Sequence, residues 1–274
     1  MEKWICKNCY TEFSQKYCGN CGQKRYTEKD KNLLAIFDEA VHFLTHFEGK
    51  FFRTMSVLLF RPGKFSVEYC YGIRQRYYKP VSFFLMLILL YLIFPFFEGL
   101  NMRMAFYPRL SFTGEYIQQV ITDKTLSTGY SMEELSDMFR LKSEKVSKVL
   151  LLLLIPLTAL TLKVIYFKSK RRLYDHFILA TEINNFIILI LFLLTPLLIG
   201  ILIWIAGNIP IHDEAMAPYY FIFLVAYFAI LLKRFYGQKW WITILKSILF
   251  LGLYHVIFNI IYKTILFMII INLI

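Results

Sequence analysis

The sequence predicts a mainly α-helical, polytopic membrane protein with a small amino-terminal four-cysteine zinc ribbon. Two observations carry this prediction. The mean hydropathy is +0.52 and 58% of the 274 residues are hydrophobic, which favours several apolar spans over a soluble domain. Two Cys-x-x-Cys pairs also precede the first apolar run. We therefore expect a zinc ribbon at 1–26, amphipathic interfacial helices at 30–79, and a five-span transmembrane domain at 80–274 with an external segment at about 99–148.

The first motif is a set of four cysteines in two pairs separated by eight residues: Cys6, Cys9, Cys18 and Cys21. Each pair presents two thiols from one tight turn, and Gly19 and Gly22 permit the backbone geometry of such turns. Four thiolates in a tetrahedron suit a structural Zn²⁺ and leave no open position for catalysis. The alternatives are redox-active pairs or two disulfides. The loop charges described below place this segment in a reducing cytoplasm, which disfavours the disulfides.

An amphipathic helix is predicted from Leu33 to Phe60, because its apolar residues recur at intervals of three, four or seven. Such a helix suits the headgroup plane or the surface of the spans. His42 and His46 are spaced four residues apart on it, and a metal site is the alternative to an ordinary place on the helix face.

A break and a basic, aromatic segment follow. Arg61-Pro62-Gly63 interrupts the amphipathic pattern, and cationic and aromatic residues then crowd together before Pro80: Arg74, Arg76, Tyr77, Tyr78 and Lys79. These residue types suit contact with a membrane interface and its anionic headgroups, or with a partner. We expect Arg74 to pair with Glu182, whereas Arg76 and Lys79 face lipid headgroups.

Five apolar stretches are predicted to span the membrane. They are Val81–Phe97, Val149–Phe167, Ile183–Ala206, Tyr219–Leu232, and a long one from Ile242 to the carboxy terminus. We interpret the last as one long or broken helix, because its final residues alone are too short to cross.

Loop charges predict the orientation. The loop at 167–182 is basic and includes Arg171 and Arg172, and the next basic loop includes Arg234 beside Tyr236. We expect these four residues, like those before Pro80, to lie at the lipid or partner interface. The loop at 207–218 contains two acidic residues and no lysine or arginine. Basic loops stay in the cytoplasm, so we expect the amino terminus inside and the carboxy terminus outside. The net charge of +12 then favours anionic lipid over nucleic acid as a partner.

The external segment contains a helix start. Ser131-Met-Glu-Glu134 has the pattern of a capping box. We expect the helix that begins there to run continuously into the second span.

Polar residues inside the predicted spans are functional candidates, because polar groups are costly in a bilayer. The intramembrane polar candidates are His176, Glu182, Asn185, Lys246, His255 and Asn259. His255, Asn259 and Lys263 share one helix face.

Several separated motifs resemble one bacterial family, called domain of unknown function 3667. They are Cys18-Gly-Asn-Cys21-Gly-Gln, Arg61-Pro-Gly, the stretch from Tyr69 to Pro80, Tyr174-Asp-His176, and Lys233-Arg-Phe-Tyr236-Gly237-Gln. The sequence departs from the pattern at Ile73 and after His176. The resemblance implies a bacterial cytoplasmic (inner) membrane protein with a zinc-ribbon head, and it implies no activity.

The sequence is compatible with three classes of function. The first is a non-enzymatic scaffold or membrane assembly factor whose ribbon docks a cytosolic or membrane protein. The second is a transporter, channel or lipid-handling protein with a site that opens to the cytoplasmic leaflet. The third, an enzyme using His176 with Glu182 or Asp175, lacks a supporting catalytic motif, so no catalytic residue is assigned.

Overall fold

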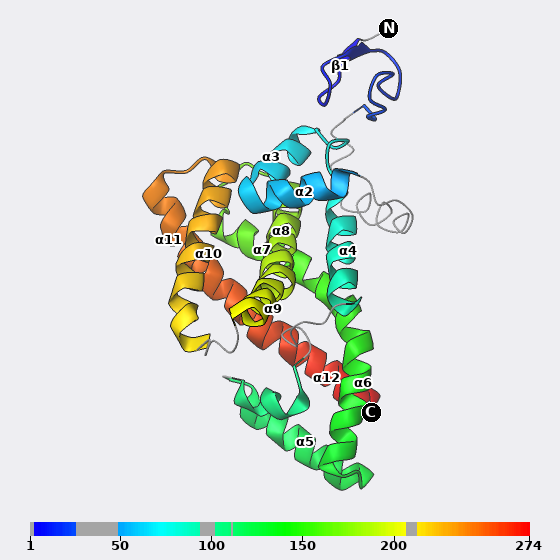
Figure 1. Cartoon of the computed structure of the whole chain (residues 1–274), viewed down its shortest axis with the longest axis vertical. Coiled ribbons are helices and arrows are strands. Elements are labelled where there is room, and N and C mark those ends of the chain that lie inside the picture. Colours follow the sequence, from blue (N-terminus) through cyan, green and yellow to red (C-terminus); the bar gives the residue numbers. More distant parts are fainter. Residues whose placement is uncertain (1–2, 26–48, 94–101, 111, 207–212) are drawn as a thin grey trace.

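A computed structural model describes residues 3–25, 49–93, 102–110, 112–206 and 213–274. Figure 1 shows a small amino-terminal head above a body of helices. The body is almost entirely helical, and the strands of the described residues lie in the head. This confirms the predicted fold class.

The head (residues 3–25) contains one short hairpin. β1 (Trp4–Ile5) pairs antiparallel with β2 (Glu12–Phe13), and Tyr17 and Lys24 form a second antiparallel bridge. The Arg25 guanidinium stacks 3.2 Å from the centre of the Trp4 ring. So small a hairpin buries little apolar surface and needs another source of stability.

The body begins with two short helices, α2 (Gly49–Phe60) and α3 (Lys64–Tyr71). α2 is the carboxy-terminal part of the predicted amphipathic helix, and it buries Phe51, Thr54 and Leu58. The remainder of that helix, with His42 and His46, lies outside the described residues.

The turn between α2 and α3 is the Arg61-Pro62-Gly63 motif. Gly63 adopts a left-handed conformation with φ of 75°. A Cβ at Gly63 would lie 2.7 Å from the backbone oxygen of Leu231. Glycine is therefore required here both by conformation and by the close approach of another helix.

Three helices of the body are long and apolar enough to cross a membrane: Leu173–Ile201, Pro218–Tyr236 and Trp240–Leu273. Within the described residues, two further apolar helices are shorter, Pro80–Tyr91 and Leu151–Ile165. All five predicted stretches thus contain helix, and three meet the length of a span. The count of five crossings stays a prediction.

The first and second stretches differ in how they begin. α4 (Pro80–Ile93) starts directly at Pro80, as expected of proline in a first turn. The second stretch is the end of a longer rod made of α6 (Met132–Leu150), the 3₁₀ turn η3 (Leu151–Leu153) and α7 (Leu154–Ile165).

The capping box at the start of α6 is confirmed. The Ser131 hydroxyl accepts from the Glu134 backbone N–H at 3.2 Å, and the Glu134 carboxylate accepts from the Ser131 N–H at 2.8 Å. These hydrogen bonds lower the pKa of Glu134. Before α6, the 3₁₀ helix η2 (Met104–Arg109) and α5 (Gly114–Thr128) form the lower part of the molecule in Figure 1.

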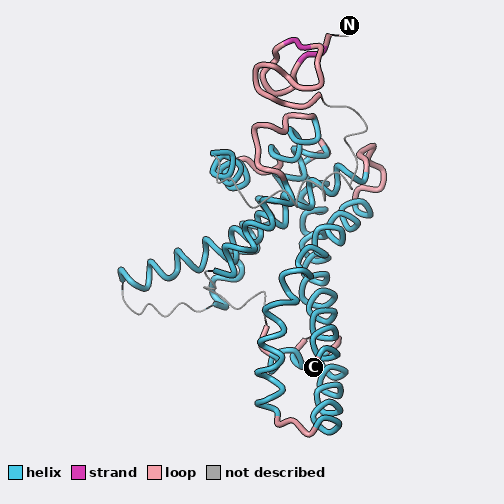
Figure 2. The backbone as a smooth tube through the Cα atoms, turned by 90° about the vertical axis from the view of Figure 1, so that its right-hand side faces the viewer, coloured by secondary structure: helices cyan, strands magenta, loops and turns pink. Residues whose placement is uncertain are grey.

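α8 (Leu173–Ile187) is the central helix. Every residue from Tyr174 to Ile187 is buried, because α2, α3, α4 and α7 all pack against it. It continues through a π-helical segment, η4 (Ile188–Leu194), into α9 (Thr195–Ala206). Figure 2 shows the rods of the body inclined to one another.

The carboxy-terminal part is a hairpin of two long helices. α10 (Asp213–Tyr236) is followed by Gly237, which has φ of 70° and terminates the helix. α11 (Trp240–Val256), the π-helical η5 (Ile257–Tyr262) and α12 (Lys263–Leu273) then form one rod. The predicted long carboxy-terminal helix is thus continuous, and its α12 part packs on α6.

The close approach at Gly63 generates a stability prediction. Gly63→Ala should lower the free energy of unfolding by roughly 3 kcal/mol, because left-handed strain adds to a clash with the α10 backbone. Gly129 is a matched control, since it has φ of 72° and a Cβ there would meet no described atom within 4 Å. Gly129→Ala should cost about 1–2 kcal/mol. Equal shifts of the melting temperature in detergent would contradict the account.

Candidate metal centre and buried polar core

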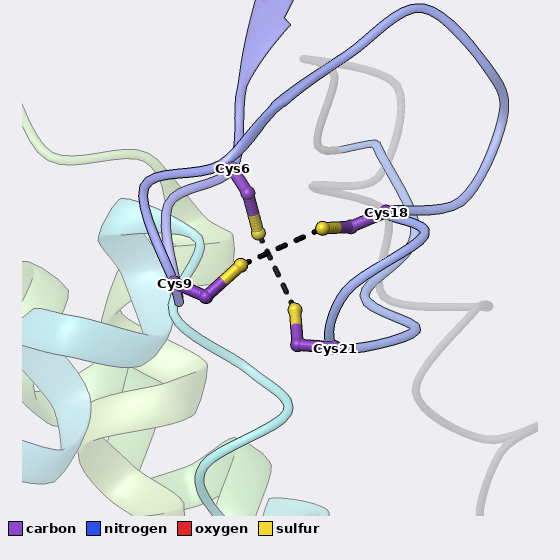
Figure 3. Close-up of side chains that lie close together, drawn as sticks. All are labelled: Cys6, Cys9, Cys18 and Cys21. Carbon is purple, nitrogen blue, oxygen red and sulfur yellow. Dashed lines mark hydrogen bonds between the residues drawn. The ribbon is translucent and has the colours of Figure 1, made fainter.

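The head brings the four predicted cysteines together. Figure 3 shows their side chains converging on one point from two loops. All four sulfur atoms lie within 4.8 Å of one another. The Cys6–Cys21 and Cys9–Cys18 sulfur pairs are each 3.5 Å apart. A tetrahedral ion with metal–sulfur bonds of about 2.3 Å separates its ligands by about 3.8 Å, so the cluster is suited to hold one metal ion.

The two loops that carry the cysteines have the same backbone design. The Cys6 carbonyl accepts from the Tyr10 N–H at 2.9 Å, and the Cys18 carbonyl accepts from the Gly22 N–H at 2.8 Å. Tyr10 and Gly22 occupy equivalent positions with φ of 60° and 71°. The predicted need for glycine therefore holds at Gly22, whereas the first loop places a tyrosine in the left-handed conformation.

Two of the thiols differ in acidity. Burial raises the pKa of Cys6 to about 12. Hydrogen bonding with Thr11 lowers the pKa of Cys9 to about 6. A cation bound among the four sulfurs would favour the thiolate form of each and would add stability to a head that has little core.

One side of the head packs on the body. Lys7 Nζ donates to the Tyr71 hydroxyl at 3.0 Å. The Gln75 amide donates to the Gly22 carbonyl at 3.3 Å, and the Gln23 amide donates to the Gly72 carbonyl. The contacts join both cysteine loops to the end of α3 and to the segment that follows it. We call the body residues that form these contacts, Tyr71, Gly72 and Gln75, the seat of the head.

The central feature of the body is the carboxylate of Glu182. It is completely buried. One oxygen accepts from the Gly63 N–H and the other from the Ser66 N–H, both at 2.8 Å. Ser66 also donates from its hydroxyl to the Ile178 carbonyl at 3.4 Å. Glu182 thus binds the free amides at the amino terminus of α3, a position that favours negative charge.

The prediction that Arg74 pairs with Glu182 is wrong. Arg74 donates to the Tyr174 hydroxyl at 2.9 Å and lies over the rings of Tyr69 and Tyr174. The backbone of α3 takes the predicted place of the guanidinium at Glu182.

The rest of the basic, aromatic segment also contacts protein. Arg76 lies 3.5 Å from Glu68, whose carboxylate also accepts from the Tyr77 hydroxyl at 2.6 Å. Tyr77 is buried, so its predicted place at the lipid or partner interface is corrected to the core. Burial and the Glu68 carboxylate raise the pKa of Tyr77. Tyr78 donates its N–H to the Thr54 hydroxyl at 2.9 Å, and Lys79 is exposed.

Three cationic segments gather at the end of the body that carries the head. Arg171 donates to the Phe235 carbonyl at 3.0 Å. Arg234 donates to the Pro62 carbonyl and links α10 to the turn before α3. Arg172 and Arg234 stay exposed. We call this region, made of residues 72–79, 166–172 and 233–239, the cationic end.

A second polar link on α8 joins the middle of the body. The Asn184 amide donates to the Thr158 hydroxyl at 3.1 Å and accepts from the Tyr254 hydroxyl at 2.9 Å. Asn185 donates to the Pro80 carbonyl at 3.3 Å. The two amides together therefore tie α8 to three neighbours: α7, α11 and α4.

His176 belongs to an aromatic cluster at the cationic end. Its Nδ1 lies 2.7 Å from the Tyr236 hydroxyl. Tyr236 stacks on Tyr166 with ring centres 3.6 Å apart, and Lys246 lies 4.2 Å from the Tyr166 ring. Tyr236 and Lys246 thus pack against side chains of the body, on His176 and Tyr166. Three atoms in this buried cluster have no hydrogen-bond partner within the described part of the chain: His176 Nε2, Asp175 Oδ1 and the Tyr166 hydroxyl.

The predicted polar residues therefore fall into two groups. Those on α8 are buried, and Lys246 is half-buried against an aromatic ring. His255 is exposed, and Asn259 is half-buried beside it. Cys70 is buried away from the head, near Asp175, and burial raises the pKa of its thiol. The structure gives Cys70 no part in the four-thiol cluster.

Sequence reasoning missed Asn184, Tyr166 and Tyr227. Tyr227 donates to the Leu58 carbonyl at 2.6 Å and stacks on Phe186. A tyrosine or asparagine inside an apolar run was a usable signal, because such residues need partners in a span. The run Asn184-Asn185 beside Glu182 contained that signal.

Comparison with known proteins adds one match. Residues 48–92 match the model of a family described as Protein of unknown function (DUF3667). This range contains α2, α3, the seat of the head and nearly all of α4. No curated protein and no solved structure matches the chain. The family predicted from the sequence motifs is therefore confirmed over residues 48–92.

Proposed function

We propose that this chain is an integral membrane scaffold or assembly factor that uses a Zn²⁺-bound head to dock a partner protein. The observation that carries the proposal is the two-sided character of the head. One side is fixed to the body through Lys7, Gln23 and Gln75. Large apolar side chains elsewhere on the head remain 52–71% exposed: Ile5, Tyr10 and Tyr17.

Zn²⁺ is the metal that the ligand set favours, since four thiolates in a tetrahedron suit it better than a hard cation. Four protein ligands leave no site for substrate, so the ion has a structural role. A head with a small core then depends on the metal for its fold, and the exposed apolar side chains depend on it for their placement.

The membrane and the orientation also belong to this proposal. Arg171, Arg234 and the segment at 72–79 share one end of the body, and basic segments stay on the cytoplasmic side. We place the head in the cytoplasm of a bacterium, beside the anionic headgroups of the inner membrane. The rod Trp240–Leu273 is long enough to carry the carboxy terminus to the other side.

A transporter, channel or lipid-handling protein is the second candidate. The observation that favours it is the buried cluster of Asp175, His176 and Tyr166, whose unpartnered polar atoms, among the described residues, lie at the cationic end. Buried polar groups without partners mark places where a ligand or water is bound. No catalytic role is proposed for this cluster.

The metal prediction concerns stoichiometry. The purified full-length protein should contain one Zn²⁺ per chain by elemental analysis. Replacing all four head cysteines by serine should remove it, because serine hydroxyls do not replace thiolates as zinc ligands. Cys70→Ser is the matched control and should keep the ion, since Cys70 lies outside the four-thiol cluster. Loss of metal in the Cys70 variant, or two ions per chain, would refute the assignment.

The docking prediction separates the two candidate functions. Cross-linking in intact cells followed by mass spectrometry should find one protein joined to the head. The double substitution Tyr10→Ser and Tyr17→Ser should lower its yield about tenfold or more, since exposed aromatic residues dominate such interfaces. Phe112→Ser is the control, because Phe112 is 92% exposed but belongs to the body. Unchanged cross-links in the head variant, with zinc retained, would reject docking and favour the second candidate.

A further inference from the structure

The outer face of the long carboxy-terminal rod has a polar pair at its centre. His255 and Asn259 are the sixteenth and twentieth of the 34 residues from Trp240 to Leu273. At 1.5 Å per residue, both lie within about 4 Å of the helix midpoint along its axis. The rest of this span is strongly apolar. In a span centred on the bilayer, the pair lies where polar groups are least tolerated.

His255 faces away from the body, and Asn259 is half-buried beside it. The buried residues of α11 are Thr243, Ser247, Phe250 and Tyr254, whereas His255 is exposed. Asn259 Nδ2 donates to His255 Nδ1 at 3.1 Å. This bond leaves His255 Nε2, the Asn259 carbonyl oxygen and one amide hydrogen as further hydrogen-bonding capacity.

The same face is shaped for a helix. Ile248, Gly252, His255 and Asn259 are spaced by four, three and four residues, so they form one stripe. A Cβ at Gly252 would have no described atom within 4 Å. A small residue beside polar ones is the pattern that lets two membrane helices approach closely and exchange hydrogen bonds. One turn further on, Lys263 is not part of this stripe, because its ammonium lies over the Phe258 ring, 5.5 Å from the ring centre.

We propose that this stripe on α11 and η5 is a homodimer interface, in which a second copy of the chain packs parallel to the first in the membrane. Any occupant must offer polar groups at the depth of His255. A second copy inserted in the same orientation does so by symmetry. Asparagine and histidine each contain a donor and an acceptor, so the pair is complementary to itself across a two-fold axis. This inference is independent of the proposed docking by the head.

The test counts subunits in a bilayer. Full-length protein labelled with one fluorophore per chain is placed in lipid vesicles at low density, and photobleaching steps are counted. Wild type should show two-step bleaching. The double substitution His255→Leu and Asn259→Leu should weaken association about tenfold, the change expected when two symmetry-related interhelical hydrogen bonds are lost. Leu253→Ala is the control, because Leu253 is exposed on the same helix but lies off the stripe.

Two further measurements keep the proposal falsifiable. If the double variant fails to fold, Gly252→Ile replaces it, because the open space at Gly252 lets the monomer fold while the added side chain blocks the partner. A photo-cross-linking residue at Val256 should yield a product of twice the chain mass. A wild type that is monomeric at every density, a variant that dimerises like wild type, or a cross-linked product containing another protein would each overturn the proposal.

Discussion

The fold depends on one buried carboxylate and two backbone amides. Glu182 lies on the central helix, and its oxygens accept from Gly63 and Ser66 at the start of α3. An isolated buried carboxylate costs several kcal/mol, and hydrogen bonds to charged groups return about 1.5–3 kcal/mol each. The free amides of a helix amino terminus are also buried here and need an acceptor. The carboxylate and the two amides therefore satisfy each other, and the pairing fixes the start of α3 against α8.

The position of α3 then determines the seat of the head and the cationic end. The turn before α3 brings Pro62 to Arg234 and Gly63 to Leu231, which ties α10 to the same point. The end of α3 and the segment after it bring Tyr71, Gly72 and Gln75 to the head. Further along α8, the side chains of Asn184 and Asn185 form hydrogen bonds that fix α8 against α7, α11 and α4. Polar side chains thus specify helix positions in a body whose apolar surfaces alone would fit together in many ways.

Much of this architecture followed from sequence. Hydropathy located the apolar helices, the spacing of the cysteines located the head, and Ser131 with Glu134 located the start of α6. The partner of Glu182 did not follow, because a search for a cation ignores backbone amides, which have no letter in a sequence. Tyr77 and Tyr236 were assigned to an interface from their residue type, yet contacts with other helices, to Glu68 of α3 and to His176 of α8, bury or engage them. The seat of the head was missed for the same reason.

The most direct test of the central claim is a pair of matched substitutions. Glu182→Gln keeps the size of the side chain but points an amide N–H₂ at one backbone donor, and should lower the free energy of unfolding by roughly 3 kcal/mol. Glu134→Gln changes a carboxylate that also caps a helix but is exposed. Thermal melts in detergent at neutral pH should show a large fall in melting temperature for the first variant and a small one for the second. Equal small shifts would show that the Glu182 carboxylate does not hold the fold together.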